Sequence, residues 1–234
     1  MRLKLIGCEV LYRELCAAAA RSVNEVDVEF LPKGLHDLGC SAMLSRLQQA
    51  VDEVDGARYE SVALGYALCG NGLAGLRARS LPLIVPRAHD CITLFLGSGQ
   101  RYLDYFNSHP GVYFQTSGWI ERGRGPDTQI SLRYDDLVER YGEEDARYLR
   151  QELTRHYRQL TFIEMGVEPD DRFEQQARAE AAERGWAFEK VPGDMRLIRQ
   201  LVDGPWDERD FLAVGPGLRV VPRHDDGIIA AEPA

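Results

Sequence analysis

The chain has 234 residues, of which 44% are hydrophobic and 28% are charged, and its formal net charge is −9 at pH 7. This length and composition are typical of a globular protein with one large domain or two small ones, which can bury a core without disulfides. The acidic balance argues against a nucleic-acid or anionic-membrane surface, and no stretch approaches the ~18 apolar residues of a membrane span.

Hydrophobic periodicity, bounded by glycine, proline and capping residues, predicts alternating strands and helices. We expect strands at 3–7, 26–31, 61–67, 81–85, 112–116, 160–165, 187–191 and 211–215. Helices are expected between them at 9–21, 42–54, 91–107 with a break at 97–99, 171–184 and 194–202. The charged region at 121–159 is expected to be mostly helical, with a loop at 122–127.

This alternation predicts an α/β fold, with a mostly parallel open sheet that carries helices on both faces and with room for two α/β halves. Residues 1–120 are expected to form an α/β domain that holds the functional site. Residues 121–221 are expected to form a charged helical segment and a second α/β half, and 222–234 a loose tail.

The five cysteines are expected to be thiols, because their number is odd and the N-terminus reaches a carboxylate, Glu9, before any export signal could form. We therefore expect a cytoplasmic protein. Cys16 lies in an alanine-rich helix and is interpreted as a packing residue, and Cys40 is interpreted as incidental.

Side chains that bind soft or borderline metals follow several predicted strands. Cys8 follows the first strand, Cys69 the third, and His89 and Cys91 the fourth, while His36 follows the second. In a flavodoxin-like strand order (2-1-3-4) the first, third and fourth strands are neighbours, and ligands bind at the carboxyl ends of parallel strands. The pattern predicts a zinc site, with an iron–sulfur cluster as the alternative.

Two other interpretations of the same residues need no metal. Each cysteine could simply be buried, as free cysteines often are. Alternatively, Cys91 at a helix N-terminus could be a nucleophile, with His89 holding its proton or activating Cys69 instead. The amides of Gly70 and Gly72 would then form an oxyanion hole.

The segment Gly70-Asn71-Gly72-Leu73-Ala74-Gly75 matches a dinucleotide-binding pattern, with Asp90 about twenty residues further on. The helix after it is short and basic, however. We favour a tight turn in which the backbone of Gly70, Asn71 and Gly72 passes close to a ligand or metal.

Three charged residues are further candidates for the site. Arg87 lies in the charge-poor centre of the sequence near Asp90, so it is either a buried ion-pair partner or a binder of a substrate carboxylate or phosphate. Glu121, after the fifth predicted strand and next to Trp119, could be a general base, a ligand or a turn carboxylate.

Several residue strings point to a known family. They are Cys8-Glu9-Val10, Gly34-Leu35-His36, Leu64-Gly65-Tyr66-Ala67-Leu68-Cys69-Gly70-Asn71-Gly72, Pro86-Arg87-Ala88-His89-Asp90-Cys91-Ile92-Thr93-Leu94, Gly97-Ser98 and Gly118-Trp119-Ile120-Glu121. On these strings nearly the whole chain resembles the family called domain of unknown function 1638, which has no established activity.

The resemblance implies a role in one-carbon metabolism, because such proteins are often encoded beside corrinoid-dependent methyltransferase systems. We therefore expect a metal-dependent transferase of one-carbon or methyl-group metabolism that acts on a small anionic or zwitterionic molecule. A corrinoid protein or a methyltransferase subunit is the expected protein partner. The alternative is a non-catalytic accessory or metal-chaperone subunit of such a system.

Overall fold

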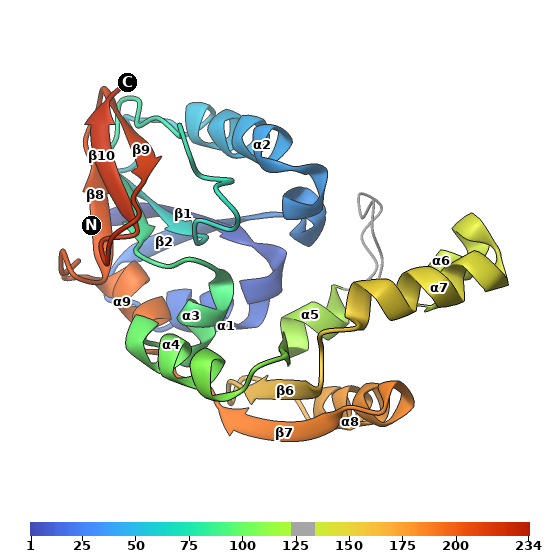
Figure 1. The fold of residues 1–234 in the computed structure, drawn as a ribbon. Helices are drawn as coiled ribbons and strands as arrows, with labels where there is room; N and C mark the ends of the chain where they lie inside the picture. The colour runs from blue at the N-terminus through green and yellow to red at the C-terminus, as the bar shows by residue number, and fades with distance from the viewer. Residues whose placement is uncertain (123–133) are drawn as a thin grey trace.

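The structure is a computed structural model that describes residues 1–122 and 134–234 (Figure 1), without the side chains at 36–38, 134–136 and 150. Most of the loop expected at 122–127 lies outside the described residues. Two parallel-stranded sheets, here called sheet A and sheet C, organise the chain, and a separate hairpin lies near the C-terminus.

Sheet A has the strand order β2-β1-β3-β4-β8. Its strands are β1 (Arg2–Cys8), β2 (Glu25–Leu31), β3 (Ser61–Gly65), β4 (Leu83–Pro86) and β8 (Phe211–Val214). The first four are mutually parallel, whereas β8 pairs antiparallel with β4. The α/β fold and the expected 2-1-3-4 order are therefore confirmed.

Helices cover both faces of sheet A because its strands are apolar on both sides. In β1, Leu3 and Leu5 pack into the cluster formed with α1 (Tyr12–Ala19), α3 (Cys91–Leu96) and α9 (Arg196–Asp203). Ile6 points the other way, into the cluster formed with α2 (Cys40–Asp52). All three side chains are fully buried, and each such burial contributes about 1.5–3 kcal/mol.

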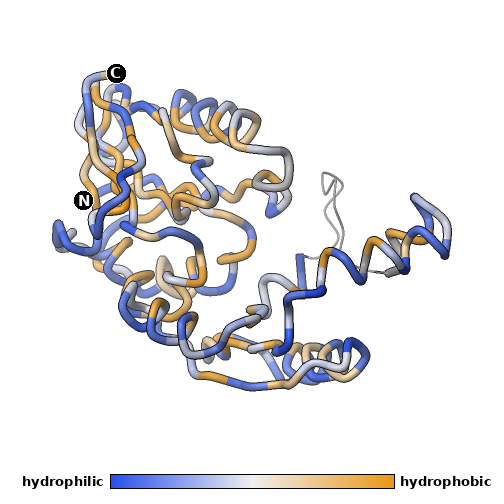
Figure 2. Tube along the Cα trace, in the orientation of Figure 1, coloured by the Kyte–Doolittle hydropathy of each residue, from blue (hydrophilic) through white to orange (hydrophobic). Residues whose placement is uncertain are grey.

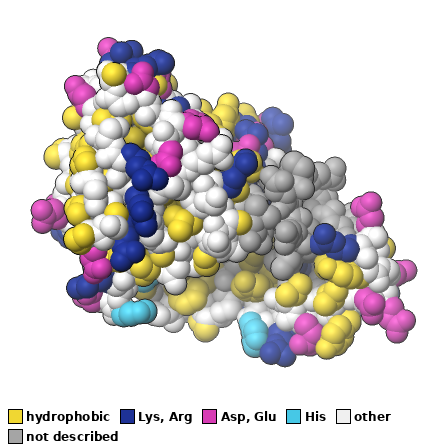
Figure 3. All heavy atoms as spheres, turned by 90° about the horizontal axis from the view of Figure 1, so that it is seen from above, with side chains coloured by type: hydrophobic (Ala, Val, Ile, Leu, Met, Phe, Trp, Pro, Cys, Tyr) yellow, Lys and Arg dark blue, Asp and Glu magenta, His cyan; other side chains and the backbone are white. Residues whose placement is uncertain are grey.

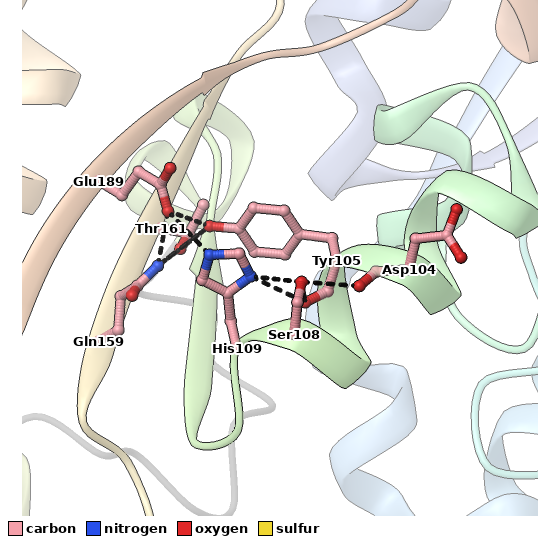
Figure 4. A network of polar contacts seen from close by, with 7 residues as sticks. All are labelled: Asp104, Tyr105, Ser108, His109, Gln159, Thr161 and Glu189. Carbon is pink, nitrogen blue, oxygen red and sulfur yellow. Dashed lines mark hydrogen bonds and ion pairs between the residues drawn. The ribbon is translucent and has the colours of Figure 1, made fainter.

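Sheet C is a smaller parallel sheet in the order β5-β6-β7. Its strands are β5 (Val112–Gln115), β6 (Gln159–Glu164) and β7 (Ala187–Pro192), and α8 (Arg172–Arg184) packs on β6 and β7. A polar network attaches α4 (Gly99–Ser108) to this sheet, as Figure 4 shows. The Tyr105 hydroxyl donates to Glu189 Oε2 at 2.5 Å and lies 2.8 Å from Thr161 Oγ1.

The charged region contains the expected helices, α6 (Tyr134–Tyr141) and α7 (Glu143–Thr154), which pack on each other and extend away from both sheets in Figure 1. Figure 2 shows hydrophobic residues along the strands of sheet A and a mixed pattern in α6 and α7. Basic and acidic side chains are both present on the face seen in Figure 3. No helix of the described residues is long and apolar enough to cross a membrane.

Two expectations about chain organisation are corrected. The segment 222–234 is no loose tail, because β10 (Ile229–Pro233) pairs antiparallel with β9 (Leu218–Pro222) through a backbone ladder that needs no apolar alternation. In addition, β5 precedes residue 120 but belongs to sheet C, while β8 follows it and belongs to sheet A. A boundary near residue 120 therefore does not separate the sheets.

The helix expected at 91–107 does break where glycine was expected to break it. α3 ends at Leu96, and Gly97 adopts a left-handed conformation with φ of 71°. Two short 3-10 helices also follow strands of sheet A, η1 (Glu9–Leu11) after β1 and η2 (Lys33–Leu38) after β2.

Candidate functional site

Three thiols meet at the carboxyl edge of sheet A. Cys8 is the last residue of β1, Cys69 follows β3, and Cys91 is the first residue of α3, just after β4. Because β1, β3 and β4 are parallel neighbours, their carboxyl ends lie at one edge. The Cys91 and Cys69 side chains are hydrogen-bonded, and Cys8 is close enough to both to affect their titration. We call these three residues the thiol cluster.

The loop after β3 sets the position of Cys69. Cys69, Gly70 and Asn71 all have positive φ, of 46°, 63° and 72°. This region is strained for a residue with a side chain, and such strain is concentrated at functional sites. The Cys69 amide donates to the His89 carbonyl at 2.9 Å, which ties this loop to the segment that leads into Cys91.

The predicted glycine turn is present, but residues 69–75 form turns that are not followed by the helix that a dinucleotide-binding fold requires. Gly72 is needed for packing on α2, because a Cβ there would lie 2.2 Å from Met43 Sδ. The Gly70 carbonyl accepts a hydrogen bond from Cys40 Sγ at 2.9 Å. Cys40, interpreted from the sequence as incidental, therefore contacts the loop that carries Cys69.

Burial controls the protonation of the cluster. It raises the pKa of the Cys8 thiol to about 12. The hydrogen bond that the Cys91 thiol donates to Cys69, together with burial, raises the pKa of Cys91 well above its usual value. Without a bound cation, Cys8 and Cys91 are therefore neutral thiols at pH 7.

Tyr66 is a member of this site that the sequence analysis missed. Its side chain is 3% exposed, and its buried hydroxyl interacts with the Cys8 thiol. Burial and the nearby thiols of Cys8 and Cys69 raise its pKa well above the usual value. The available signal was a tyrosine just beyond a wholly apolar strand, since an aromatic hydroxyl buried there needs a partner.

The rim of the cluster carries a cation and an indole. Lys33 Nζ lies 3.5 Å from the Trp119 carbonyl oxygen and 6.0 Å from the centre of its ring. The charge of Lys33 lowers the pKa of Cys8 and that of Glu9 raises it, so both lie within electrostatic reach of the thiol. Lys33 was not among the predicted site residues.

Trp119 reaches the rim because α5 (Ser117–Glu121) packs directly on η1. A Cβ at Gly118 would lie 1.8 Å from the Val10 carbonyl oxygen, so only glycine allows this approach of the two backbones. Val10 is two residues after Cys8. The same contact therefore fixes the chain that leaves the thiol cluster.

Other predicted residues have structural partners in this structure. The Asp90 carboxylate caps α3 by accepting from Ile92 N at 3.0 Å, and it also accepts from the Tyr102 hydroxyl at 2.9 Å. Glu121 forms a two-point ion pair with Arg13, at 2.7 and 3.0 Å.

Arg87 holds the C-terminal hairpin. Its guanidinium donates to the carbonyl oxygens of Glu208 at 2.8 Å and Gly227 at 2.6 Å, and also to that of Ile229. His89 is exposed, so its ring stands apart from the buried thiols. His36 belongs to η2, but its side chain lies outside the described part of the structure.

The cluster offers soft donors for a metal, but not a finished coordination sphere. Among the described side chains, which exclude that of His36, no three His, Cys, Asp or Glu residues form a set arranged to hold a metal ion. Three thiols fit zinc or an iron–sulfur cluster by donor type. Binding would require the three sulfurs to draw together.

The comparisons with known proteins give a family and no function. A family model described as "Protein of unknown function (DUF1638)" matches residues 30–202, well over half of the chain. The matched span includes Lys33, Tyr66, Cys69 and Cys91, whereas Cys8 precedes it. No curated protein and no solved structure matches the chain.

Proposed function

This chain belongs to the DUF1638 family, and we propose that it binds a metal ion at the thiol cluster, with zinc favoured over an iron–sulfur cluster. The observation that carries this proposal is the meeting of Cys8, Cys69 and Cys91 at one edge of sheet A, where all three are half-buried. The three thiols come from the ends of three neighbouring parallel strands, where α/β proteins bind their ligands.

The protonation of the thiols supports a cation as their ligand. A buried thiolate is costly without a positive charge, and a soft metal ion supplies that charge while it displaces the protons. Plain packing of cysteines would leave two features without a reason. These are the tyrosine hydroxyl of Tyr66 buried against the Cys8 thiol and the left-handed backbone of Cys69.

The reaction that we propose is one-carbon or methyl-group transfer in the cytoplasm, with a small anionic or zwitterionic substrate. A thiolate-bound zinc would hold a substrate thiol as its reactive thiolate at neutral pH. The ammonium of Lys33 and the ring of Trp119 stand at the rim, where they suit an anionic group and an apolar group of a substrate. A corrinoid protein or a methyltransferase subunit is the proposed partner, on the family resemblance alone.

A metal-free cysteine nucleophile is less well supported. Such a nucleophile needs a lowered pKa, because the thiolate is the attacking species. Burial instead raises the pKa of Cys8 to about 12, and burial with the Cys69 hydrogen bond raises that of Cys91. The exposed ring of His89 is also poorly placed to take a proton from a buried thiol.

Elemental analysis and a visible spectrum of anaerobically purified protein test the metal site. We expect about one zinc per chain, and replacement by Co²⁺ should give thiolate charge-transfer absorption. Cys69→Ser should reduce metal affinity by at least roughly tenfold, whereas Cys40→Ser, outside the cluster, should retain it. An iron–sulfur spectrum would show that the site holds a cluster in place of zinc, and it would still support the thiol cluster as the site. Equal metal content in wild type and in the Cys69→Ser variant would contradict it.

A second measurement tests the reaction separately. Metal-loaded protein should transfer a methyl group between a methylated amine or betaine and a thiol or corrinoid acceptor. Cys69→Ser should abolish that transfer. A loaded protein without transfer to any of these acceptors would favour the accessory or metal-chaperone role and would leave the metal site standing.

A further inference from the structure

A second site lies away from the thiol cluster. A cavity of about 210 Å³ opens between the end of α1, the helix α9 and the loop that follows β6. Ala17 and Arg21 line it from the α1 side, Met165 and Gly166 from the β6 loop, and Arg199 from α9. Because β6 is the middle strand of parallel sheet C, the cavity lies at the carboxyl end of that sheet, where ligands bind in α/β proteins.

Two guanidinium groups give the mouth of this cavity a positive charge. The guanidinium groups of Arg21 and Arg199 have no hydrogen bond or ion pair with any residue that the structure describes. The one carboxylate of the lining, Asp203, already accepts from Ser22 Oγ at 2.7 Å and from Val23 N at 3.1 Å. These neutral donors leave the charge of Asp203 in place, so the lining carries one net positive charge, in a chain with a net charge of −9.

The rest of the lining is apolar. Ala18, Met165 and Met195 are at most 9% exposed and form part of the core between α1 and α9. Methionine side chains adapt to ligands of different shapes. A ligand that fits both parts of the lining therefore has one charged head and a short apolar body.

A buried carboxyl group on α1 lies one helical turn from the lining residue Ala18. Glu14 is on the same face of α1 as Ala18, and among the described residues its buried oxygens have no partner beyond the backbone of Glu14 itself. Burial raises its pKa to about 8, so this group is mostly uncharged at pH 7. It therefore adds little repulsion to a negative charge bound in the cavity.

We propose that this cavity binds a small organic anion, with a carboxylate or phosphate-monoester head held by Arg21 and Arg199 and a short apolar body on Met165 and Met195. Arginine suits both heads, because its planar fork donates two parallel hydrogen bonds to paired oxygens. None of the lining residues belongs to the thiol cluster, so this proposal does not depend on the proposed metal site and can be tested separately.

Isothermal titration of the full chain with hexanoate, butyl phosphate and hexanamide, at constant ionic strength, tests the site. We expect one site that takes hexanoate or butyl phosphate, the tighter of the two identifying the head, and no binding of the neutral amide. Arg21→Gln and Arg199→Gln should each weaken binding by roughly tenfold or more. Arg46→Gln, an exposed arginine of α2 outside the cavity, should bind as the wild type does.

A filling variant separates the cavity from general charge effects. Ala17→Leu keeps both arginines but fills the space, so it should abolish binding while thermal unfolding shows an intact fold. The proposal is overturned if neither anion binds or if hexanamide binds as tightly as hexanoate. It is equally overturned if both Arg21→Gln and Arg199→Gln match Arg46→Gln, or if a folded Ala17→Leu protein binds normally.

Discussion

The side chains of Cys69 and Cys91 are hydrogen-bonded to each other at the carboxyl edge of sheet A. They meet because β3 and β4 are parallel neighbours and because the Cys69 amide is held by the His89 carbonyl at 2.9 Å. The pair is thus brought together by backbone contacts and does not depend on a metal. A metal ion that binds there finds two of its thiol ligands already adjacent.

The rate of alkylation of each cysteine should decrease with the burial of its thiol. At about pH 8, iodoacetamide should modify the exposed Cys40 first and the half-buried Cys8 and Cys91 far more slowly. The thiolate is the reactive form, and desolvation raises the pKa of Cys8 to about 12 while the hydrogen bond with Cys69 raises that of Cys91. Peptide mapping by mass spectrometry over time measures the order. Modification of Cys8 at the rate of Cys40 would contradict a buried cluster.

Arg87→Lys separates a role in folding from a role in substrate binding. Lysine cannot reproduce the fork that donates to Glu208, Gly227 and Ile229, so carbonyls of the hairpin lose charged donors. We expect a loss of about 2–4 kcal/mol in the free energy of unfolding. Amide exchange over 218–233 should also become faster.

Arg46→Lys, on the exposed surface of α2, is the matched control and should leave the free energy of unfolding unchanged. If Arg87→Lys unfolds like this control but binds substrate more weakly, the guanidinium acts mainly on substrate, as the sequence analysis allowed.

The convergence of the thiols could be predicted because it depends on local signals. Apolar runs mark β1, β3 and β4, and crossover connections of more than a dozen residues between successive strands make them parallel. Cys8, Cys69 and Cys91 lie at the ends of these strands or within five residues of them. The outward position of His89 could not be predicted in this way. Asp90 caps α3, and this cap turns the chain so that Cys91 enters the core while the preceding side chain stays in solvent.

Long-range contacts account for the other differences. The Glu208 carbonyl that Arg87 contacts lies 121 residues further along the chain, and no pattern near residue 87 indicates it. The strand β10 has the sequence Ile-Ala-Ala-Glu-Pro, which lacks the alternation of a half-buried strand. Lys33 and Trp119 meet only because η2 and α5 pack beside the same edge.

Glu14→Gln should change how stability depends on pH. Burial raises the pKa of Glu14 from 4.5 to about 8, so between these values the folded chain keeps a proton that the unfolded chain has lost. This group therefore makes wild-type stability fall as pH rises from about 4.5 to 8, by at most about 1.4 kcal/mol per pH unit, and has no further effect above that range.

Glutamine does not titrate, so the variant should match the wild type near pH 4.5 and exceed it in stability at pH 8. Urea unfolding at a series of pH values measures the difference. A constant difference across this range would mean that Glu14 is not buried as a neutral acid.

Gly118→Ala should lower both the free energy of unfolding and the zinc affinity of the thiol cluster. The new Cβ would lie 1.8 Å from the Val10 carbonyl oxygen, so α5 must move away from η1, at a cost of about 3 kcal/mol in the free energy of unfolding. Because η1 directly follows Cys8 and α5 carries Trp119, zinc affinity should also fall.

Gly99→Ala is the control, since a Cβ there meets nothing within 4 Å and alanine favours the helix α4, so it should stabilise by up to about 1 kcal/mol. Urea unfolding and zinc titration of both variants measure the two effects, and a Gly118→Ala protein as stable as Gly99→Ala would show that α5 does not hold the end of β1 in place.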